Sequence, residues 1–188
     1  SFQARGRLHA IWILSRMCNG AVSALFDIAA NDENPSVRAQ AIRALADLSD
    51  PVLLQHRLSA GRGSPNVAEC FAKLAVESEP RIVLEVLIAL GRLRWHAAPK
   101  WLEENLKRSD DQAIAHAAMQ TLRRADNWDG VLAIADGTNT FLSDVSIRAM
   151  AEQAIPELID GLIARVDGLS DRKQDYADLL TRVHRRPG

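Results

Sequence analysis

One apolar phrase recurs along this chain with helical spacing, and it constrains the fold more than any other feature of the sequence. Three strong copies and two weaker ones occupy residues 7–14, 37–45, 82–90, 113–122 and 145–155. The same position of the first four copies is filled by Ala10, Ala41, Val86 and Ala118. These positions are 31, 45 and 32 residues apart. Such a period is typical of stacked helix pairs, because each pair buries its apolar face only against its neighbours.

The residues between the copies also follow a helical period, and strand-like alternation is almost absent. The pattern predicts about five helix pairs and a closing helix, at 5–30, 36–77, 80–107, 110–135, 143–167 and 171–184. An extra segment at 50–65, with a short helix expected at 51–58, explains the longer step. Ser36 is predicted to cap the helix that follows it, and Ser143 or Asp144 to cap the helix of the fifth copy.

Two of the predicted helices, at 127–135 and 156–167, have well-defined apolar stripes. The helix at 127–135 is expected to bury Trp128, Val131, Leu132 and Ala135. The helix at 156–167 is expected to bury Leu158, Ile159, Leu162, Ile163 and Val166. Cys70 lies in another apolar stripe and is predicted to be a small buried side chain. The sequence therefore predicts an all-α fold with a continuous core.

The charge balance argues against a nucleic-acid partner. The chain has 23 Lys and Arg residues against 24 Asp and Glu residues, whereas several phosphate contacts require a clustered cationic surface. Hydrophobic residues make up 47% of the chain, but no stretch approaches the roughly 20 apolar residues of a membrane-spanning helix. We therefore expect neither a membrane span nor a nucleic-acid partner.

No residue pattern indicates a reaction, a metal or a cofactor. The five His residues form neither HxxxH nor HExxH, and no Cys lies at ligand spacing from them. The glycines at 61–63 lack the Lys-Ser/Thr pair and the preceding strand of a phosphate-binding loop. Asp110 and Asp111 fit a helix N-terminus better than a catalytic pair. We predict no catalytic residue, no metal ligand and no cofactor.

A basic and aromatic cluster is the candidate partner-binding edge. It comprises Arg92, Arg94, Trp95, His96, Lys100, Trp101, Arg123 and Arg124. Trp and Arg supply many of the energetically dominant contacts at protein interfaces. The alternative is that Trp101 anchors its short helix in the core and that the arginines beside it are merely solvated.

Arg7 and Arg38 occupy equivalent positions in the first two copies of the phrase. Each lies three residues before the shared Ala. We predict that they form ion pairs with the acidic turn of an adjacent repeat, as Asp32 and Glu33 would allow. Exposed pairs of this kind contribute about 0.5 kcal/mol each.

The turn at 32–38, which reads DENPSVR, and the phrase that follows it resemble HEAT repeats. The resemblance covers essentially the whole chain. It implies a right-handed α-solenoid, taken as a single repeat domain over residues 1–188. Its implied function is a non-enzymatic scaffold that binds a protein or a neighbouring domain of the same chain.

At a finer level, RLHAIWIL, NPSVRAQAIRAL and ADLLTRVHRR resemble the HEAT region of large planctomycete-type multidomain proteins. In those proteins a dehydrogenase-like β-propeller precedes the HEAT region and a cytochrome c-like domain follows it. The resemblance implies that this chain is a fragment of a longer protein, acting as a spacer between such modules. It also implies a periplasmic or exported location, whereas a cytoplasmic location is expected without it.

Two other function classes are alternatives to the binding scaffold. HEAT-like enzymes include bilin lyases and DNA glycosylases, and the near-neutral charge argues against the glycosylase. A domain that only spaces its neighbours would have no affinity for any partner in isolation.

Overall fold

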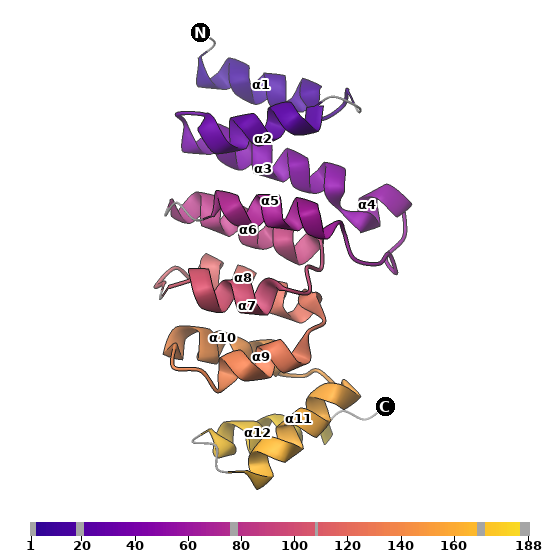
Figure 1. The fold of residues 1–188 in the computed structure, drawn as a ribbon, viewed down its shortest axis with the longest axis vertical. Coiled ribbons are helices and arrows are strands. Elements are labelled where there is room, and N and C mark those ends of the chain that lie inside the picture. Colours follow the sequence, from indigo (N-terminus) through magenta and orange to yellow (C-terminus); the bar gives the residue numbers. More distant parts are fainter. Residues whose placement is uncertain (1–2, 18–20, 76–78, 108, 169–171, 185–188) are drawn as a thin grey trace. The chain divides into compact units, whose positions relative to one another are not determined.

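The chain folds into helices that are grouped in two compact units (Figure 1). The computed structural model describes residues 3–17, 21–75, 79–107, 109–168 and 172–184, which form twelve α-helices and no β-strand. Unit 1 is Ser1–Trp95 and unit 2 is His96–Gly188. The predicted all-α repeat fold is confirmed. The single domain over 1–188 and the handedness of its solenoid stay predictions.

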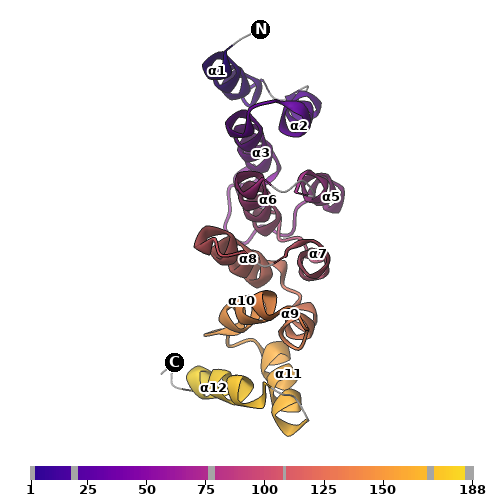
Figure 2. The same cartoon turned by 90° about the vertical axis from the view of Figure 1, so that its left-hand side faces the viewer.

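Unit 1 stacks its helices in two layers. Its helices are α1 (Ala4–Leu14), α2 (Ala21–Asn31), α3 (Pro35–Ser49), α4 (Pro51–Gln55), α5 (Pro65–Leu74) and α6 (Pro80–Arg92). Helices α1, α3 and α6 follow one another in one layer, while α2 packs on α3 and α5 packs on α6 (Figure 2). The core between the layers contains Ile11, Leu25, Ile42, Leu45, Phe71 and Ile82, all fully buried.

Unit 2 repeats this arrangement. Its helices are α7 (Ala98–Asn105), α8 (Gln112–Ala125), α9 (Trp128–Ala135), α10 (Thr140–Met150), α11 (Pro156–Asp167) and α12 (Lys173–His184). Helix α8 packs on α10 in one layer, α7, α9 and α11 succeed one another in the other layer, and α12 packs on α11 (Figure 2). No helix in the described part of the chain has the length and apolar character needed to cross a membrane.

The recurring phrase marks the buried side of the first layer in both units. Two of its positions, four residues apart, are fully buried in three copies, at Ala41, Leu45, Val86, Leu90, Ala118 and Leu122. Residues at this spacing share one helix face, so the small residue permits close approach and the leucine fills the core. The stripe Trp128, Val131, Leu132 and Ala135 is also buried as predicted.

Prolines and asparagines define several helix starts, and they correct two predicted caps. Pro35 is the first residue of α3, so Asn34 is the cap and its Oδ1 accepts from the Ser36 amide at 2.9 Å. The cap of α10 is Asn139, whose Oδ1 accepts from the Leu142 amide at 3.2 Å. The proposed caps Ser36, Ser143 and Asp144 were therefore wrong. Ser143 is instead buried within α10, and its hydroxyl donates to the Ala135 carbonyl.

Other differences concern helix ends and two apolar stripes. The fifth-copy helix ends at Met150 instead of 155, and the short inserted helix ends at Gln55 instead of 58. The predicted boundaries at residues 77 and 171 lie outside the described residues. Cys70 is exposed, because α5 turns Ala68, Phe71 and Ala72 inward and Cys70 falls on the opposite side. Ile163 is also exposed, at 45%, because α11 buries only Leu158 and Leu162.

Arginines join successive helices of unit 1. Arg7 of α1 pairs with Asp32 at 2.8 Å and with Glu33 at 3.1 Å, which confirms the predicted ion pair. For Arg38 the same prediction was wrong, since its Nε donates to the Ala29 carbonyl at 3.0 Å. The carbonyls in the last turn of a helix have no intrahelical donor, so they are available to accept such a bond.

A buried carboxylate links α3 to α6. Glu85, which interrupts the apolar run of α6, is only 3% exposed and forms an ion pair with Arg43 of α3. The hydrogen bond to Glu85 raises the pKa of Arg43. A buried charge left without its partner is strongly destabilising, so this pair fixes the register of the two helices.

Candidate protein-binding surfaces

The eight residues of the predicted edge are divided between the two units. Unit 1 contains Arg92, Arg94 and Trp95. Unit 2 contains His96, Lys100, Trp101, Arg123 and Arg124. The residues differ in how much of each side chain is exposed and in whether it is already hydrogen-bonded within its unit.

Arg92 holds the start of the inserted segment. Its Nη1 lies 2.7 Å from the Asp47 carboxylate, and its Nε lies 2.9 Å from Asp50. Burial alone would lower the pKa of Arg92, but the hydrogen bonds to Asp50 and Asp47 outweigh it, and the pKa is raised. Asp50 is itself buried, and its other carboxylate oxygen accepts from the Val52 amide at 2.8 Å, which caps α4. Arg92 therefore has a structural role, because both of its ion pairs lie within unit 1.

Arg94 closes α6 in a conformation that glycine usually adopts. The amide of Trp95 bonds to the Leu90 carbonyl and that of Arg94 to the Gly91 carbonyl, which is the Schellman arrangement. Arg94 therefore has a φ of 51°. Its guanidinium donates to the Ala60 carbonyl and, at 3.0 Å, to the Leu58 carbonyl. Trp95 beside it is half-buried.

In unit 2, Arg123 is engaged with the end of another helix. Its Nε donates to the Ala149 carbonyl at 3.0 Å, and its Nη2 donates to the carbonyls of Arg148 and Ala151 at 3.0 and 3.1 Å. A cation at these last carbonyls of α10 also complements the helix dipole. Arg123 therefore joins the C-terminal ends of α8 and α10.

The remaining residues of the predicted edge are more accessible. His96, Lys100 and Arg124 are exposed, and Trp101 is half-buried. The backbone at His96 is fixed, because the Asn127 side chain donates to its carbonyl at 2.8 Å. Of the eight residues of the predicted edge, those with exposed side chains are His96, Lys100 and Arg124, all in unit 2. Their binding role stays a prediction.

A groove that sequence reasoning missed lies between α8 and α10 of unit 2. It has a volume of about 580 Å³. Its lining comes from the residues just before α8, from the N-terminal half of α8 and from two residues of α10. It comprises Ser109, Asp110, Asp111, Gln112, Ala115, His116, Met119, Phe141 and Arg148. No signal in the sequence singled it out, because its lining comes from two helices that are not consecutive in the chain.

The lining of the groove is chemically mixed. Asp110 and Asp111 stand at the start of α8, where Asp111 also accepts from the Ala113 amide at 2.8 Å as the helix cap. Ala115, Met119 and Phe141 supply an apolar lining, while His116 and Arg148 are exposed polar groups on the two helices. The Arg148 Nε donates to the Asp144 carbonyl at 3.3 Å, a neutral acceptor. The groove therefore offers acidic, apolar and basic contacts together.

A second accessible surface belongs to unit 1. Large apolar side chains are exposed at the end of α1, where Arg16 lies 6.0 Å from the centre of the Trp12 ring, and again along the inserted segment. Over the residues that the structure covers, no three His, Cys, Asp or Glu side chains gather as a metal site would require.

One comparison with known proteins bears on the family. A family model of HEAT repeats matches residues 2–59, which include α1, α2, α3 and α4. No curated protein and no solved structure matches the chain. The matched residues contain the first two copies of the phrase and the turn between them, so the comparison supports the resemblance to the HEAT-repeat family in this part of the chain.

Proposed function

We propose that this chain is a non-enzymatic helical-repeat scaffold that binds another protein, or a neighbouring domain, through the groove between α8 and α10. HEAT repeats commonly serve as protein-interaction scaffolds, which supports the general class of function. The observation that carries the specific proposal is the groove itself, because acidic, apolar and basic contacts meet there on one accessible surface.

A polypeptide segment suits this lining better than a small apolar ligand. A basic group of the partner pairs with Asp111, an acidic group pairs with Arg148, and an apolar side chain between them covers Met119 and Phe141. Such arrangements give specificity and register more than raw affinity.

A photo-crosslinking experiment tests the proposal. A photoreactive amino acid replaces Met119 in the groove or, as the matched control, Ala133, which is exposed on α9. We expect a crosslinked polypeptide from the Met119 position and none from Ala133, and we expect Arg148→Glu to abolish it. Equal crosslinking at both positions, or crosslinking that survives Arg148→Glu, would refute binding through the groove.

The finer part of the proposal is a spacer role in a multidomain protein. It is supported by the resemblance of three short phrases to HEAT regions that lie between a β-propeller and a cytochrome c-like domain. The coding sequence on both sides of this region tests it. A propeller upstream and a CxxCH motif downstream are expected, and their absence would remove the spacer role while leaving the groove proposal intact.

A further inference from the structure

The groove between α8 and α10 carries opposite charges on its two walls. Asp111 belongs to the α8 wall and Arg148 to the α10 wall, and both side chains are exposed. The hydrogen bonds that the structure describes for these two side chains go to neutral backbone groups, namely the Ala113 amide and the Asp144 carbonyl. The bond of Arg148 uses its Nε, which leaves both Nη groups to face a carboxylate. Both charges are therefore available to a partner.

The two walls run in the same direction, so the charges also lie at opposite ends of the groove. Arg123 near the end of α8 bonds to carbonyls at the end of α10, and the starts of the two helices line the groove through Asp111 and Phe141. At the helical rise, the α8 wall from Asp111 to Met119 is about 12 Å long. The α10 wall from Phe141 to Arg148 is about 10 Å long.

The dimensions and the polar lining of the groove suit an extended segment better than a helix. A helix with its side chains is about 10–12 Å across, which is wider than the roughly 8–10 Å between the axes of neighbouring helices. An extended chain needs only about 5 Å. It also keeps unpaired backbone N–H and C=O groups, and Gln112 and His116 of α8 offer polar side chains to them.

We propose that the groove selects an extended segment of the partner in which a basic and an acidic residue are three positions apart, with two apolar residues between them. Three positions of an extended chain span about 10 Å, which matches the length of the walls. Successive side chains point to opposite sides, so an odd separation places one charge against Asp111 of α8 and the other against Arg148 of α10. The two residues between them face Phe141 and Met119. The inference rests on the proposed function and defines the segment that the groove recognises.

This register distinguishes the groove from a surface that binds any peptide of mixed charge. With one residue fewer or one more between the two charges, both charged side chains point to the same wall. One of them then lies against an apolar side chain, where a charge without a partner is unfavourable. The separation of the two charges should therefore matter more than the composition of the peptide.

The test uses the whole chain and synthetic peptides of about ten residues, which is long enough to fill the groove at the extended rise. One peptide contains Lys-Ile-Ile-Glu, the second contains the reverse order Glu-Ile-Ile-Lys, and the third contains the permuted order Lys-Ile-Glu-Ile. Isoleucine is chosen because β-branched residues favour extended conformations. Fluorescence anisotropy should show binding of at least one of the first two peptides and roughly tenfold weaker binding of the permuted peptide.

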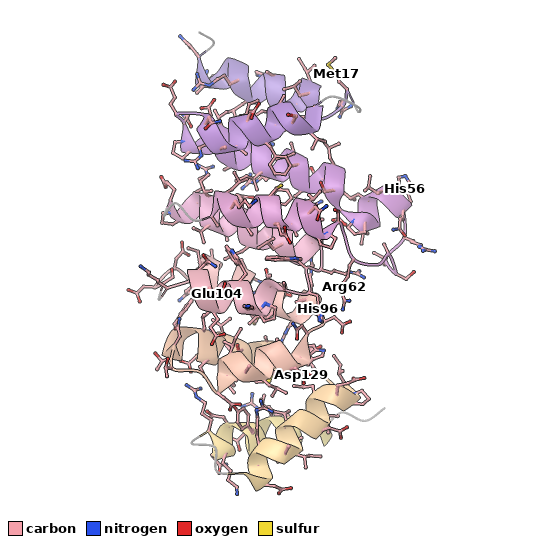
Figure 3. The ribbon with its side chains drawn as sticks, in the orientation of Figure 1. Met17, His56, Arg62, His96, Glu104 and Asp129 are labelled. Carbon is pink, nitrogen blue, oxygen red and sulfur yellow. The ribbon has the colours of Figure 1, made fainter. Side chains whose placement is uncertain are left out.

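Variants of the two charged residues identify the contacts. Asp111→Asn removes the charge but keeps a good helix cap, and Arg148→Gln removes the opposite charge. Each should weaken binding of the matching peptide roughly tenfold. In Arg148→Glu, replacing the Glu of that peptide by Lys should restore binding. Asp129→Asn is the matched control, since Asp129 is also exposed near the start of a helix, and Figure 3 labels it on α9, outside the groove lining.

The control variant should bind the peptides as the unchanged chain does, and circular dichroism confirms that each variant remains folded. Equal binding of the permuted peptide would overturn the inference. So would a lack of binding by both Lys-Ile-Ile-Glu and its reverse, or binding that neither Asp111→Asn nor Arg148→Gln weakens. If the Met119 crosslink forms while the permuted peptide binds equally well, the groove function survives and the register alone is lost. If the crosslink also fails, both are lost.

Discussion

The connection between α3 and α5 and the connection between α8 and α9 follow equivalent copies of the phrase, yet they are built in different ways. Between α8 and α9 the chain turns within two residues, Asp126 and Asn127. Between α3 and α5 it runs from Asp50 to Ser64 and contains a helix of its own. The same repeat position thus accommodates a tight turn in one unit and a long insertion, residues 51–64, in the other. We call residues 51–64 the excursion.

The difference lies in where the stabilising groups come from. In the short connection Asn127 both caps α9, accepting from the Gly130 amide at 3.0 Å, and donates to the His96 carbonyl. In the long connection the stabilising groups are Arg92, Leu93 and Arg94, more than twenty residues away in the sequence. A short turn depends mainly on its own side chains, whereas a long loop needs bonds from the next repeat to offset its greater conformational entropy.

The largest expected effect comes from the buried end of the excursion. Asp50→Ala removes the cap of α4 and the buried acceptor of Arg92, and should cost about 2–3 kcal/mol in the free energy of unfolding. Asp47→Ala is the matched control, because Asp47 pairs with the same Arg92 but is exposed, and it should cost about 0.5 kcal/mol. Urea denaturation measures both. Equal losses would mean that burial does not distinguish the two carboxylates.

A smaller loss is expected from the short turn. Asn127→Ala removes the cap hydrogen bond and the bond to His96, and should cost about 1–2 kcal/mol by thermal or urea unfolding. Asn127→Asp keeps the accepting oxygen but loses the donor, so it should recover about half of that loss. If Asn127→Ala unfolds like the unchanged chain, the turn is not stabilised locally and the comparison fails.

Arg94→Gly should change dynamics more than stability. Glycine relieves the left-handed strain at this residue, worth about 1 kcal/mol, while the bonds to Leu58 and Ala60 are lost. The free energy of unfolding should therefore shift by less than about 1 kcal/mol. Hydrogen exchange of the Gly63 amide should accelerate by roughly tenfold as the excursion loosens. Unchanged exchange would show that Arg94 does not restrain the excursion.

The smallest effect is expected on the exposed surface of the excursion. Leu58→Ser should alter the free energy of unfolding by less than about 0.5 kcal/mol, because the Leu58 side chain is already 85% exposed in the folded chain and buries little apolar surface. Urea denaturation checks this. A loss above about 1 kcal/mol in the free energy of unfolding would show that Leu58 packs against the rest of the chain.

The features that could be predicted from the sequence are those set by local helical periodicity, such as which face of a helix is buried. The stripe of α9 could be read directly, because Val131 and Leu132 share a face with Trp128 at spacings of three and four. The pair of Arg7 with Asp32 could also be predicted, since the acidic turn lies between the first and second copies of the phrase. The start of α3 was off by one residue, because Pro35 occupies the first helical position and moves the cap to Asn34. The start of α10 was off by three residues, because its cap is Asn139 and not Ser143 or Asp144.

The candidate surfaces were much less predictable, because they depend on which helices come together. Arg92 and Arg94 look like solvated cations in the sequence, and only the fold brings Asp50 and the Leu58 carbonyl to them. The groove needs Met119 of α8 and Phe141 of α10 on one surface, a juxtaposition that no motif encodes. Residue type alone therefore identified interaction-prone side chains without identifying those already used for structure.

The attachment of the excursion has a consequence for how such a chain can change. The contacts described above that hold residues 51–64 are concentrated at Asp50 and at residues 92–94. Residues 51–64 and the residues at 92–94 that hold them can therefore be gained, lost or exchanged together, while the helices on either side keep their cores. A family of repeat proteins could acquire a new specificity by recombining these two segments, and a protein engineer could transfer them to another repeat in the same way.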